Sequence, residues 1–127
     1  MQVIADTSFL MIPGMFGVDI LSEIERLLVG RYELLIPRSV LQELERISEH
    51  GKPKERIAAK LGLRLVERGS VVEVKGEADE SILKLASQKR CAVGTTDAAL
   101  RKELRRRGIS VIYLCQKSHL AKDGQFG

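Results

Sequence analysis

Short, mostly apolar runs alternate with amphipathic stretches along nearly the whole chain, and this alternation is the feature that most constrains the fold. The runs are three to five residues long, which suits buried strands, while the stretches between them repeat apolar residues at helical spacing. The expected strands lie at residues 3–5, 34–36, 71–74, 91–94 and 110–114. The expected helices lie at residues 18–29, 38–49, 53–67, 78–89 and 98–107.

Strands that alternate with helices predict an α/β domain, in which helices cover both faces of a parallel sheet. Right-handed crossovers then bring the carboxyl ends of all the strands to one edge. Ligands of such sheets bind outside those carboxyl ends, at the point where the strand order reverses. We therefore expect the chemistry in residues that directly follow strands.

The chain has 127 residues, which is enough for one domain with a single core. We expect that domain to cover residues 1–115 and the tail at 116–127 to be frayed. No long apolar run or signal peptide is visible, so a cytoplasmic protein without a membrane partner is predicted. The net charge of +4 is compatible with a polyanionic partner but does not establish one.

The cysteines and histidines form no pattern that is typical of a site. Cys91 and Cys115 lie in apolar runs with no CxxC partner, so we expect buried thiols and no zinc site. His50 and His119 fall in a polar loop and in the tail, where we expect them to be solvated. The spacing gives no support for a Ser–His–Asp nucleophile.

Two aspartates follow expected strands. Asp6 directly follows residues 3–5, and Asp97 lies just past residues 91–94. If those strands are neighbours, the carboxylates meet without a Lys or Arg from either run, and a divalent metal is the usual remedy for their repulsion. Taken singly, each has an ordinary alternative, because Asp6 could open a turn and Asp97 could cap the next helix.

Helical periodicity singles out Asp79 in the expected helix at 78–89. Asp79 falls inside the apolar stripe of that helix, whereas Glu77 and Glu80 fall outside it. A carboxylate on the core-facing side is costly unless it is paired or metal-bound. The alternative is that Asp79 only decorates the helix N-terminus, where the helix dipole tolerates it.

The expected helix at 38–49 has two candidate glutamates. Glu43 and Glu45 flank opposite sides of its buried face, so periodicity alone does not choose between them. A solvated flank is the alternative for both.

Four short motifs carry a family resemblance. They are Val-Ile-Ala-Asp-Thr-Ser at 3–8, Pro-Arg-Ser-Val-Leu-Gln-Glu-Leu at 37–44, Ala-Asp-Glu-Ser-Ile at 78–82 and Thr-Thr-Asp at 95–97. In order and spacing they resemble the acidic motifs of the PIN-domain nucleases. The resemblance runs from about residue 2 to residue 115, and four motifs in order are more specific than any one of them.

The resemblance implies a three-layer α/β/α sandwich with a central parallel five-stranded sheet, and a PIN-like nuclease domain at 1–115. It implies a catalytic cluster that binds Mg²⁺ or Mn²⁺, formed by Asp6, Glu43, Asp79 and Asp97. It thereby selects Glu43 over Glu45. It also suggests Thr95, and more weakly Ser8, as hydroxyls that support the cluster. The implied activity is metal-dependent endoribonucleolytic hydrolysis of RNA, in which the metal activates a water molecule.

Within the family, residues 13–19 and the compact length resemble small archaeal proteins related to the PIN nucleases of small-subunit rRNA processing. VapC-type toxins share the acidic pattern but look less similar in this loop. They remain an alternative, and only that alternative brings an antitoxin partner. Homodimers are common among the proteins that it resembles, but the sequence does not fix the oligomeric state. No zinc ribbon is expected, because two isolated cysteines do not suffice for one.

Two other functions are alternatives to the nuclease. A non-catalytic RNA-binding scaffold would not need the complete set of carboxylates. A phosphatase with an aspartate nucleophile would want a second aspartate two residues after Asp6, where Ser8 stands.

Basic residues after Asp97 are the candidates for RNA contact. They are Arg101, Lys102, Arg105, Arg106 and Arg107. Such residues position RNA through its phosphates without reading sequence, and a solvated helix face is the alternative. Lys52, Lys54 and Arg56 form a possible second patch. Aromatic residues are only 4% of the chain, so base stacking is expected to contribute little.

Overall fold

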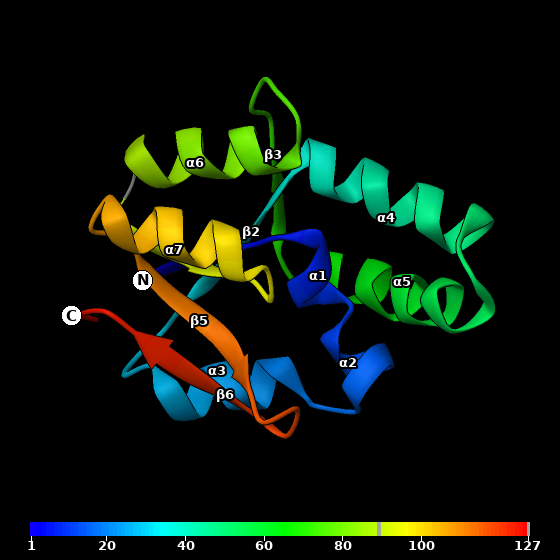
Figure 1. Ribbon diagram of the computed structural model, residues 1–127, viewed down its shortest axis with the longest axis horizontal. Coiled ribbons are helices and arrows are strands. Elements are labelled where there is room, and N and C mark those ends of the chain that lie inside the picture. Colours follow the sequence, from blue (N-terminus) through cyan, green and yellow to red (C-terminus); the bar gives the residue numbers. More distant parts are fainter. Residues whose placement is uncertain (89, 127) are drawn as a thin grey trace.

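The computed structural model describes residues 1–88 and 90–126, which form one six-stranded sheet with helices on both faces (Figure 1). The strands are β1 (Gln2–Ala5), β2 (Glu33–Pro37), β3 (Ser70–Val72), β4 (Cys91–Gly94), β5 (Ser110–Cys115) and β6 (His119–Asp123). The helices are α1 (Thr7–Leu10), α2 (Ile12–Phe16), α3 (Ile20–Leu27), α4 (Arg38–His50), α5 (Pro53–Val66), α6 (Ala78–Gln88) and α7 (Ala98–Arg106).

The predicted α/β class with a mostly parallel sheet is confirmed. The strand order is β3-β2-β1-β4-β5-β6, and β1 to β5 run parallel. The chain steps outward from β1 to β2 and β3, and then returns across β1 to β4. The strand order therefore reverses between β1 and β4, which is where ligands of such sheets bind.

The expected five strands and frayed tail are wrong at residues 119–123. β6 pairs antiparallel with β5, and Leu120 on it is fully buried. The hairpin turns through Gln116 and Lys117, both with φ near +55°. Neither is the Gly, Asn or Asp that usually marks such a turn, so the sequence carried no hairpin signal there.

Other element boundaries differ by a few residues. The stretch expected to be a loop before residue 18 contains the short helices α1 and α2, and β3 ends at Val72 rather than at residue 74. The predicted end, at Lys89, of the helix expected at 78–89 lies outside the described residues. No helix in the described part of the chain is long and apolar enough to cross a membrane.

The two cysteines and two histidines differ in part from expectation. Cys91 and Cys115 are half-buried rather than buried. His50 is exposed at the end of α4, as expected, whereas His119 is half-buried in β6.

The centre of the sheet is built so that α1 can pack closely over it. Val3, Ile4 and Ala5 of β1 are fully buried, and Ala5 lies opposite Gly94 of β4. A Cβ at Gly94 would lie 2.7 Å from the ring of Phe9, so only glycine lets α1 approach there. This packing fixes α1, and with it Asp6, at the carboxyl end of β1.

Candidate active site

Asp6 lies between β1 and α1 and is 5% exposed. Its Oδ1 accepts hydrogen bonds from the backbone N of Phe9 at 2.8 Å and from Ser8 Oγ at 2.7 Å, and its Oδ2 accepts one from Thr95 Oγ1. Burial raises the pKa of Asp6 to about 6, although these hydrogen bonds act to lower it. Asp6 therefore does cap a helix, but it is also a buried carboxylate with no cation beside it among the described residues.

Two hydroxyls connect Asp6 to the segment that leads to Asp97. Thr95 is fully buried, and besides donating to Asp6 its Oγ1 accepts from the backbone N of Asp97 at 3.0 Å. Ser8 Oγ accepts from the backbone N of Thr96 at 3.1 Å. The carboxyl ends of β1 and β4 are thus joined by side chains as well as by the sheet.

Asp97 is exposed and caps α7. Its Oδ1 accepts from the backbone N of Ala99 at 2.9 Å and of Leu100 at 3.1 Å. The capping role considered from the sequence is therefore real. It occupies Oδ1, while Oδ2 accepts no hydrogen bond from the described residues and remains available to a ligand.

Asp79 is exposed, so the expectation that it faces the core is wrong. The fully buried residues of α6 start at Ser81 and Ile82, so Asp79 precedes the buried part of the helix. Even so, the pKa of Asp79 is raised, first by partial loss of water and then by the negative charges of Asp97 and Glu43.

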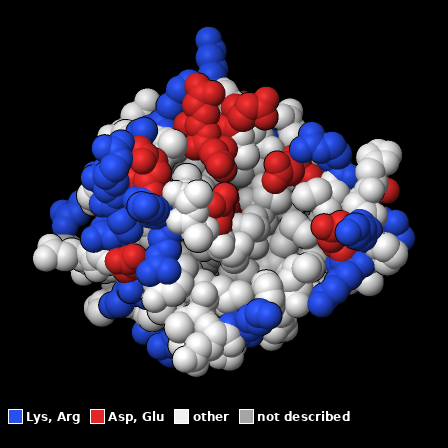
Figure 2. All heavy atoms as spheres, viewed as in Figure 1, with Lys and Arg blue, Asp and Glu red and all other residues white. Residues whose placement is uncertain are grey.

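These charge effects place Asp6, Glu43 and Asp97 within electrostatic reach of Asp79. Asp79 also raises the pKa of Asp6, as the smallest of the causes that act on it. Glu43, on α4, is half-buried and lies 3.7 Å from the guanidinium of Arg46, a long contact. Figure 2 shows acidic side chains gathered at the top centre of this face, with Lys and Arg side chains over α7 beside them. We call Asp6, Glu43, Asp79 and Asp97 the acidic cluster.

The acidic cluster has the ligand atoms that a divalent cation prefers, but its carboxylates are too far apart to coordinate one together. Carboxylate oxygens are the ligands that Mg²⁺ and Mn²⁺ prefer. Beside Asp6, the buried Oγ1 of Thr7 has no hydrogen-bond partner among the described residues. Within the same residues, however, no three His, Cys, Asp or Glu side chains stand close enough together to hold a metal ion. A bound cation would have to draw the carboxylates inward.

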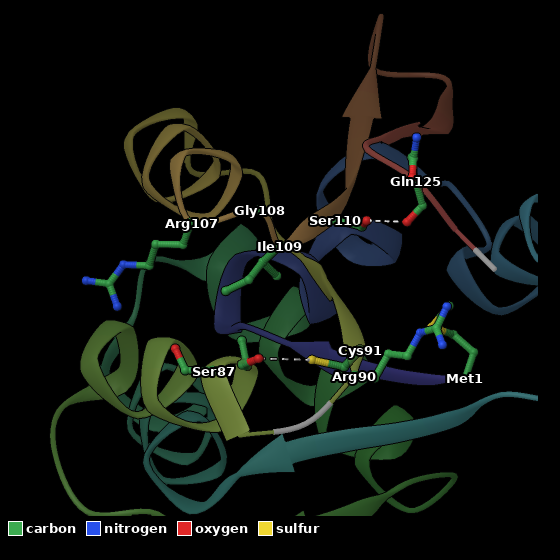
Figure 3. A pocket seen from close by; sticks show the side chains of 10 residues that line it. Met1, Ser87, Arg90, Cys91, Arg107, Gly108, Ile109, Ser110 and Gln125 are labelled. Carbon is green, nitrogen blue, oxygen red and sulfur yellow. Dashed lines mark hydrogen bonds between the residues drawn. The ribbon is translucent and has the colours of Figure 1, made fainter.

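A cavity of about 510 Å³ opens elsewhere, at the amino ends of β4 and β5 (Figure 3). It is lined by Met1, Arg90 and Arg107 among others. In Figure 3 the side chains of Arg90 and Arg107 point away from one another, so they do not converge on one ligand. We therefore place the site at the carboxylates and not at this cavity.

The basic residues of α7 are mostly paired within the protein. Arg101 and Arg105 form ion pairs with Asp123 at 2.9 and 3.2 Å. Arg106 and Arg107 pair with Glu103 at 2.6 and 2.9 Å. Lys102 is exposed and has no ion pair among the described residues. In the suggested second patch, Lys52 and Lys54 are exposed, whereas Arg56 is half-buried and donates to the carbonyl of Gly51.

Two serines beside the acidic cluster escaped the sequence analysis. Ser39 Oγ of α4 and Ser81 Oγ of α6 are 2.9 Å apart. Ser81 interrupts the apolar stripe of its helix, and a polar residue on a buried face was the signal that could have found it.

The fold and the acidic cluster together define the class: an α/β domain with carboxylates gathered where the strand order reverses. A sequence model of the family described as "PIN like domain" matches residues 3–117, and the chain belongs to that family. The family resemblance predicted from the motifs is thus confirmed.

Two relatives are ribonucleases by name. Ribonuclease VapC9 of Archaeoglobus fulgidus is 33% identical over 111 residues, which cover 87% of this chain and 81% of that protein. Ribonuclease VapC4 of Methanocaldococcus jannaschii is 31% identical over 122 residues, which cover 93% of each. The sequence relatives therefore carry the name of the alternative function.

Solved structures show the same fold. The PIN domain endonuclease Utp24 aligns with a TM-score of 0.80 and 21% identity, covering 98% of this chain and 92% of that one. A domain of a functionally unknown protein from Methanocaldococcus jannaschii aligns with a TM-score of 0.64 and 19% identity, covering 99% and 96%. At these identities the likeness concerns the fold alone.

Proposed function

We propose that this protein is a divalent-metal-dependent endoribonuclease that hydrolyses RNA phosphodiester bonds at the carboxyl edge of its sheet. The observation that carries the proposal is the acidic cluster, in which Asp6 is buried with a raised pKa and has no cation beside it among the described residues. Perturbed carboxylates of this kind gather at functional sites. Membership of the PIN-like family and two relatives named ribonucleases support the same activity.

The acidic cluster would hold Mg²⁺ or Mn²⁺. When bound, such a cation lowers the pKa of a water molecule and stabilises the charge that develops on the phosphate. Thr95 and Ser8 fix the Asp6 carboxylate by hydrogen bonds to its two oxygens, so its orientation is set before any ligand arrives. Asp97 is held in place by its capping hydrogen bonds, and Lys102 is the α7 cation best able to contact an RNA phosphate.

The test is cleavage of labelled single-stranded and structured RNA in Mn²⁺, Mg²⁺ or EDTA. The wild type is compared with Asp6→Asn, and Glu45→Gln serves as a matched control on the solvent-exposed side of α4. We expect cleavage that needs the metal, is lost in Asp6→Asn and persists in Glu45→Gln. Metal-dependent cleavage that survives in Asp6→Asn would place the active site elsewhere. Salt-sensitive RNA binding without any cleavage would favour the non-catalytic scaffold.

The proposed substrate follows from the resemblance to rRNA-processing nucleases, so we expect ribosomal precursor RNA to be cut at defined sites. Mapping the ends produced from total RNA tests this. Cuts confined to ribosomal precursors support the processing role, and cuts spread over messenger or transfer RNA contradict it.

One feature of the surface favours the VapC-type alternative. A cavity of about 420 Å³ lies between α2 and α5, lined partly by Pro13, Val18 and Leu65. Leu61, which lines it, is 37% exposed, and Phe16 of α2 and Ile57 of α5 are 40% and 61% exposed. Exposed apolar side chains on these helices suit a protein partner such as an inhibitory antitoxin. Induced expression in a bacterial host tests the alternative. Growth arrest by the wild type, but not by Asp6→Asn, supports a toxin, and unimpaired growth counts against one.

A further inference from the structure

The serine pair between α4 and α6 has a defined hydrogen-bond direction. Ser81 Oγ donates to the carbonyl of Ala78 at 2.9 Å. A serine hydroxyl carries one proton, so the contact of 2.9 Å between Ser81 Oγ and Ser39 Oγ is donated by Ser39. The chain of hydrogen bonds therefore runs from α4 into the first turn of α6.

Packing alone does not account for a serine at position 81. Ser81 is fully buried, and a hydroxyl in such a place destabilises the protein unless it is hydrogen-bonded. Alanine has nearly the same size and a higher helix propensity. We therefore attribute the hydroxyl at position 81 to its hydrogen bond with Ser39. We call Ser39 and Ser81 the serine clasp.

The serine clasp joins the two helices that carry Glu43 and Asp79. Ser39 precedes Glu43 by four residues, which places both on one side of α4, one turn apart. Ser81 and its acceptor Ala78 bracket Asp79 in the first turn of α6. Because Glu43 and Asp79 have like charges, they push these helix ends apart, and a buried bond between the helices opposes that separation.

A second contact at the same place is of a different kind. Arg38, at the start of α4, pairs with Glu73 after β3 at 2.7 Å. Both side chains are well exposed, so the pair is screened by water and salt and is a weak restraint. The serine clasp is half-buried to buried and better suited to fixing a distance.

We propose that the serine clasp positions Glu43 and Asp79 for joint binding of one divalent cation, an inference that rests on the proposed function of the acidic cluster. Ser39 and Ser81 are positioning residues that touch neither the cation nor the RNA. Removing groups that orient metal ligands typically weakens metal affinity by about 10-fold to 100-fold. Loss of either hydroxyl should therefore weaken cation binding while the fold persists.

The test is calorimetric titration of Mn²⁺ into metal-free protein, for wild type, Ser39→Ala, Ser81→Ala and the double variant. We expect each single variant to bind Mn²⁺ about 10-fold more weakly. The double variant should be no weaker than either single one, because both substitutions remove the same bond. Ser39→Thr keeps a hydroxyl and should restore affinity, and RNA cleavage by the single variants should recover at saturating Mn²⁺.

Each helix offers a matched control. Ser48 of α4 and Ser87 of α6 donate to carbonyls of their own helices, at 2.7 Å each, and neither hydroxyl bonds to another helix among residues 1–88 and 90–126. Ser48→Ala and Ser87→Ala should therefore bind Mn²⁺ like the wild type. A thermal melt in EDTA verifies that every variant is folded.

The outcomes separate this inference from the proposed function. Wild-type affinity in both clasp variants, or losses that add in the double variant, would overturn the clasp alone, provided that the wild type binds Mn²⁺ and cleaves RNA. A lower melting temperature with unchanged Mn²⁺ affinity would reduce the clasp to a structural bond. A wild type that neither binds Mn²⁺ nor cleaves RNA would overturn both.

Discussion

The acidic cluster and helix α7 lie side by side, yet they differ in whether their charged side chains have ion-pair partners. Among the described residues Asp6, Asp79 and Asp97 have no ion-pair partner, and Glu43 has a distant one. On α7 and at its C-cap, by contrast, four arginines are paired with only two carboxylates, Asp123 and Glu103. The charge of the first region is left uncompensated, whereas much of the charge of the second is balanced within the protein.

The difference is visible in two carboxylates of these regions. Burial raises the pKa of Asp6 to about 6, whereas hydrogen bonds from Arg106 and Arg107 lower the pKa of Glu103 to about 2. Asp6 therefore destabilises the metal-free fold at neutral pH, and Glu103 stabilises it. A buried carboxylate that destabilises the fold, such as Asp6, indicates that this residue has a role other than stability. A run of arginines, in contrast, is not by itself a binding surface.

The largest expected effect comes from Asp6→Asn, measured by thermal and denaturant unfolding in EDTA. The folded chain holds the Asp6 proton up to about pH 6, and the unfolded chain only to about 3.8, so wild-type stability falls as pH rises through that window. A neutral Asn escapes this loss. We expect a gain of about 3 kcal/mol at about pH 8, and almost none below about pH 4.

The same experiment in Mn²⁺ provides the control. A cation held by the acidic cluster should stabilise the wild type and not Asp6→Asn. In Mn²⁺ the stability advantage of Asp6→Asn over the wild type should therefore become smaller or change sign. If Asp6→Asn is less stable than the wild type at about pH 8 in EDTA, the hydrogen bonds to the Asp6 carboxylate outweigh the cost of its burial. Asp6 would then stabilise the fold, and the proposed contrast with Glu103 would be wrong.

The next effect is expected from Asp123→Asn on β6. This change removes the partner of Arg101 and Arg105 and should lower the free energy of unfolding by about 1 kcal/mol, because these pairs are only about a third exposed. It should also leave two cations without an ion pair, although Arg101 still lies over the ring of Tyr113 and Arg105 still donates to the carbonyl of Ile109. Binding of single-stranded RNA should tighten, and its salt dependence should steepen by about 0.7 for each new phosphate contact. Unchanged RNA affinity would show that this face of α7 does not meet RNA.

Residues next to strands and helix ends could be predicted from the sequence. Strand ends and periodicity drew attention to Asp6, Asp97 and Asp79, and the structure brings all three to one edge of the sheet. Local patterns suffice here because a parallel sheet sends every strand's carboxyl end the same way. Helical periodicity does not distinguish Glu43 from Glu45, and only the family resemblance indicates Glu43.

What failed depends on contacts between distant parts of the chain. The sequence did not predict β6, because its turn uses Gln116 and Lys117 rather than typical turn residues. Without β6, the ion pairs of Asp123 with α7 could not be predicted either. Asp79 is exposed because the buried part of α6 starts only at Ser81, and periodicity does not show where along a helix burial begins. The serine clasp likewise joins residues 42 positions apart.

A smaller effect should separate Lys102 from its neighbours on α7. Lys102→Ala removes an exposed cation without an ion pair among the described residues, so RNA binding should weaken a few-fold and its salt slope should decrease by about 0.7. Arg106→Ala removes a cation already held by Glu103 at 2.6 Å and should change RNA binding less. Fluorescence anisotropy at several salt concentrations measures both. A larger loss for Arg106→Ala would mean that RNA displaces Glu103.

The smallest effect, and of opposite sign to that of Asp6→Asn, is expected from Glu103→Gln. The pKa of Glu103 is lowered from 4.5 to about 2, so its ion pairs stabilise the fold above about pH 4.5, and this contribution is lost as pH falls toward 2. Glu103→Gln should therefore lower the melting temperature slightly at neutral pH. The difference should vanish near pH 2, and also in about 1 M salt, which screens exposed pairs. Melts over pH and salt measure it. A Glu103→Gln loss that persists in high salt would mean that Glu103 matters through packing or hydrogen bonding, and charge balance would no longer explain why the two regions differ.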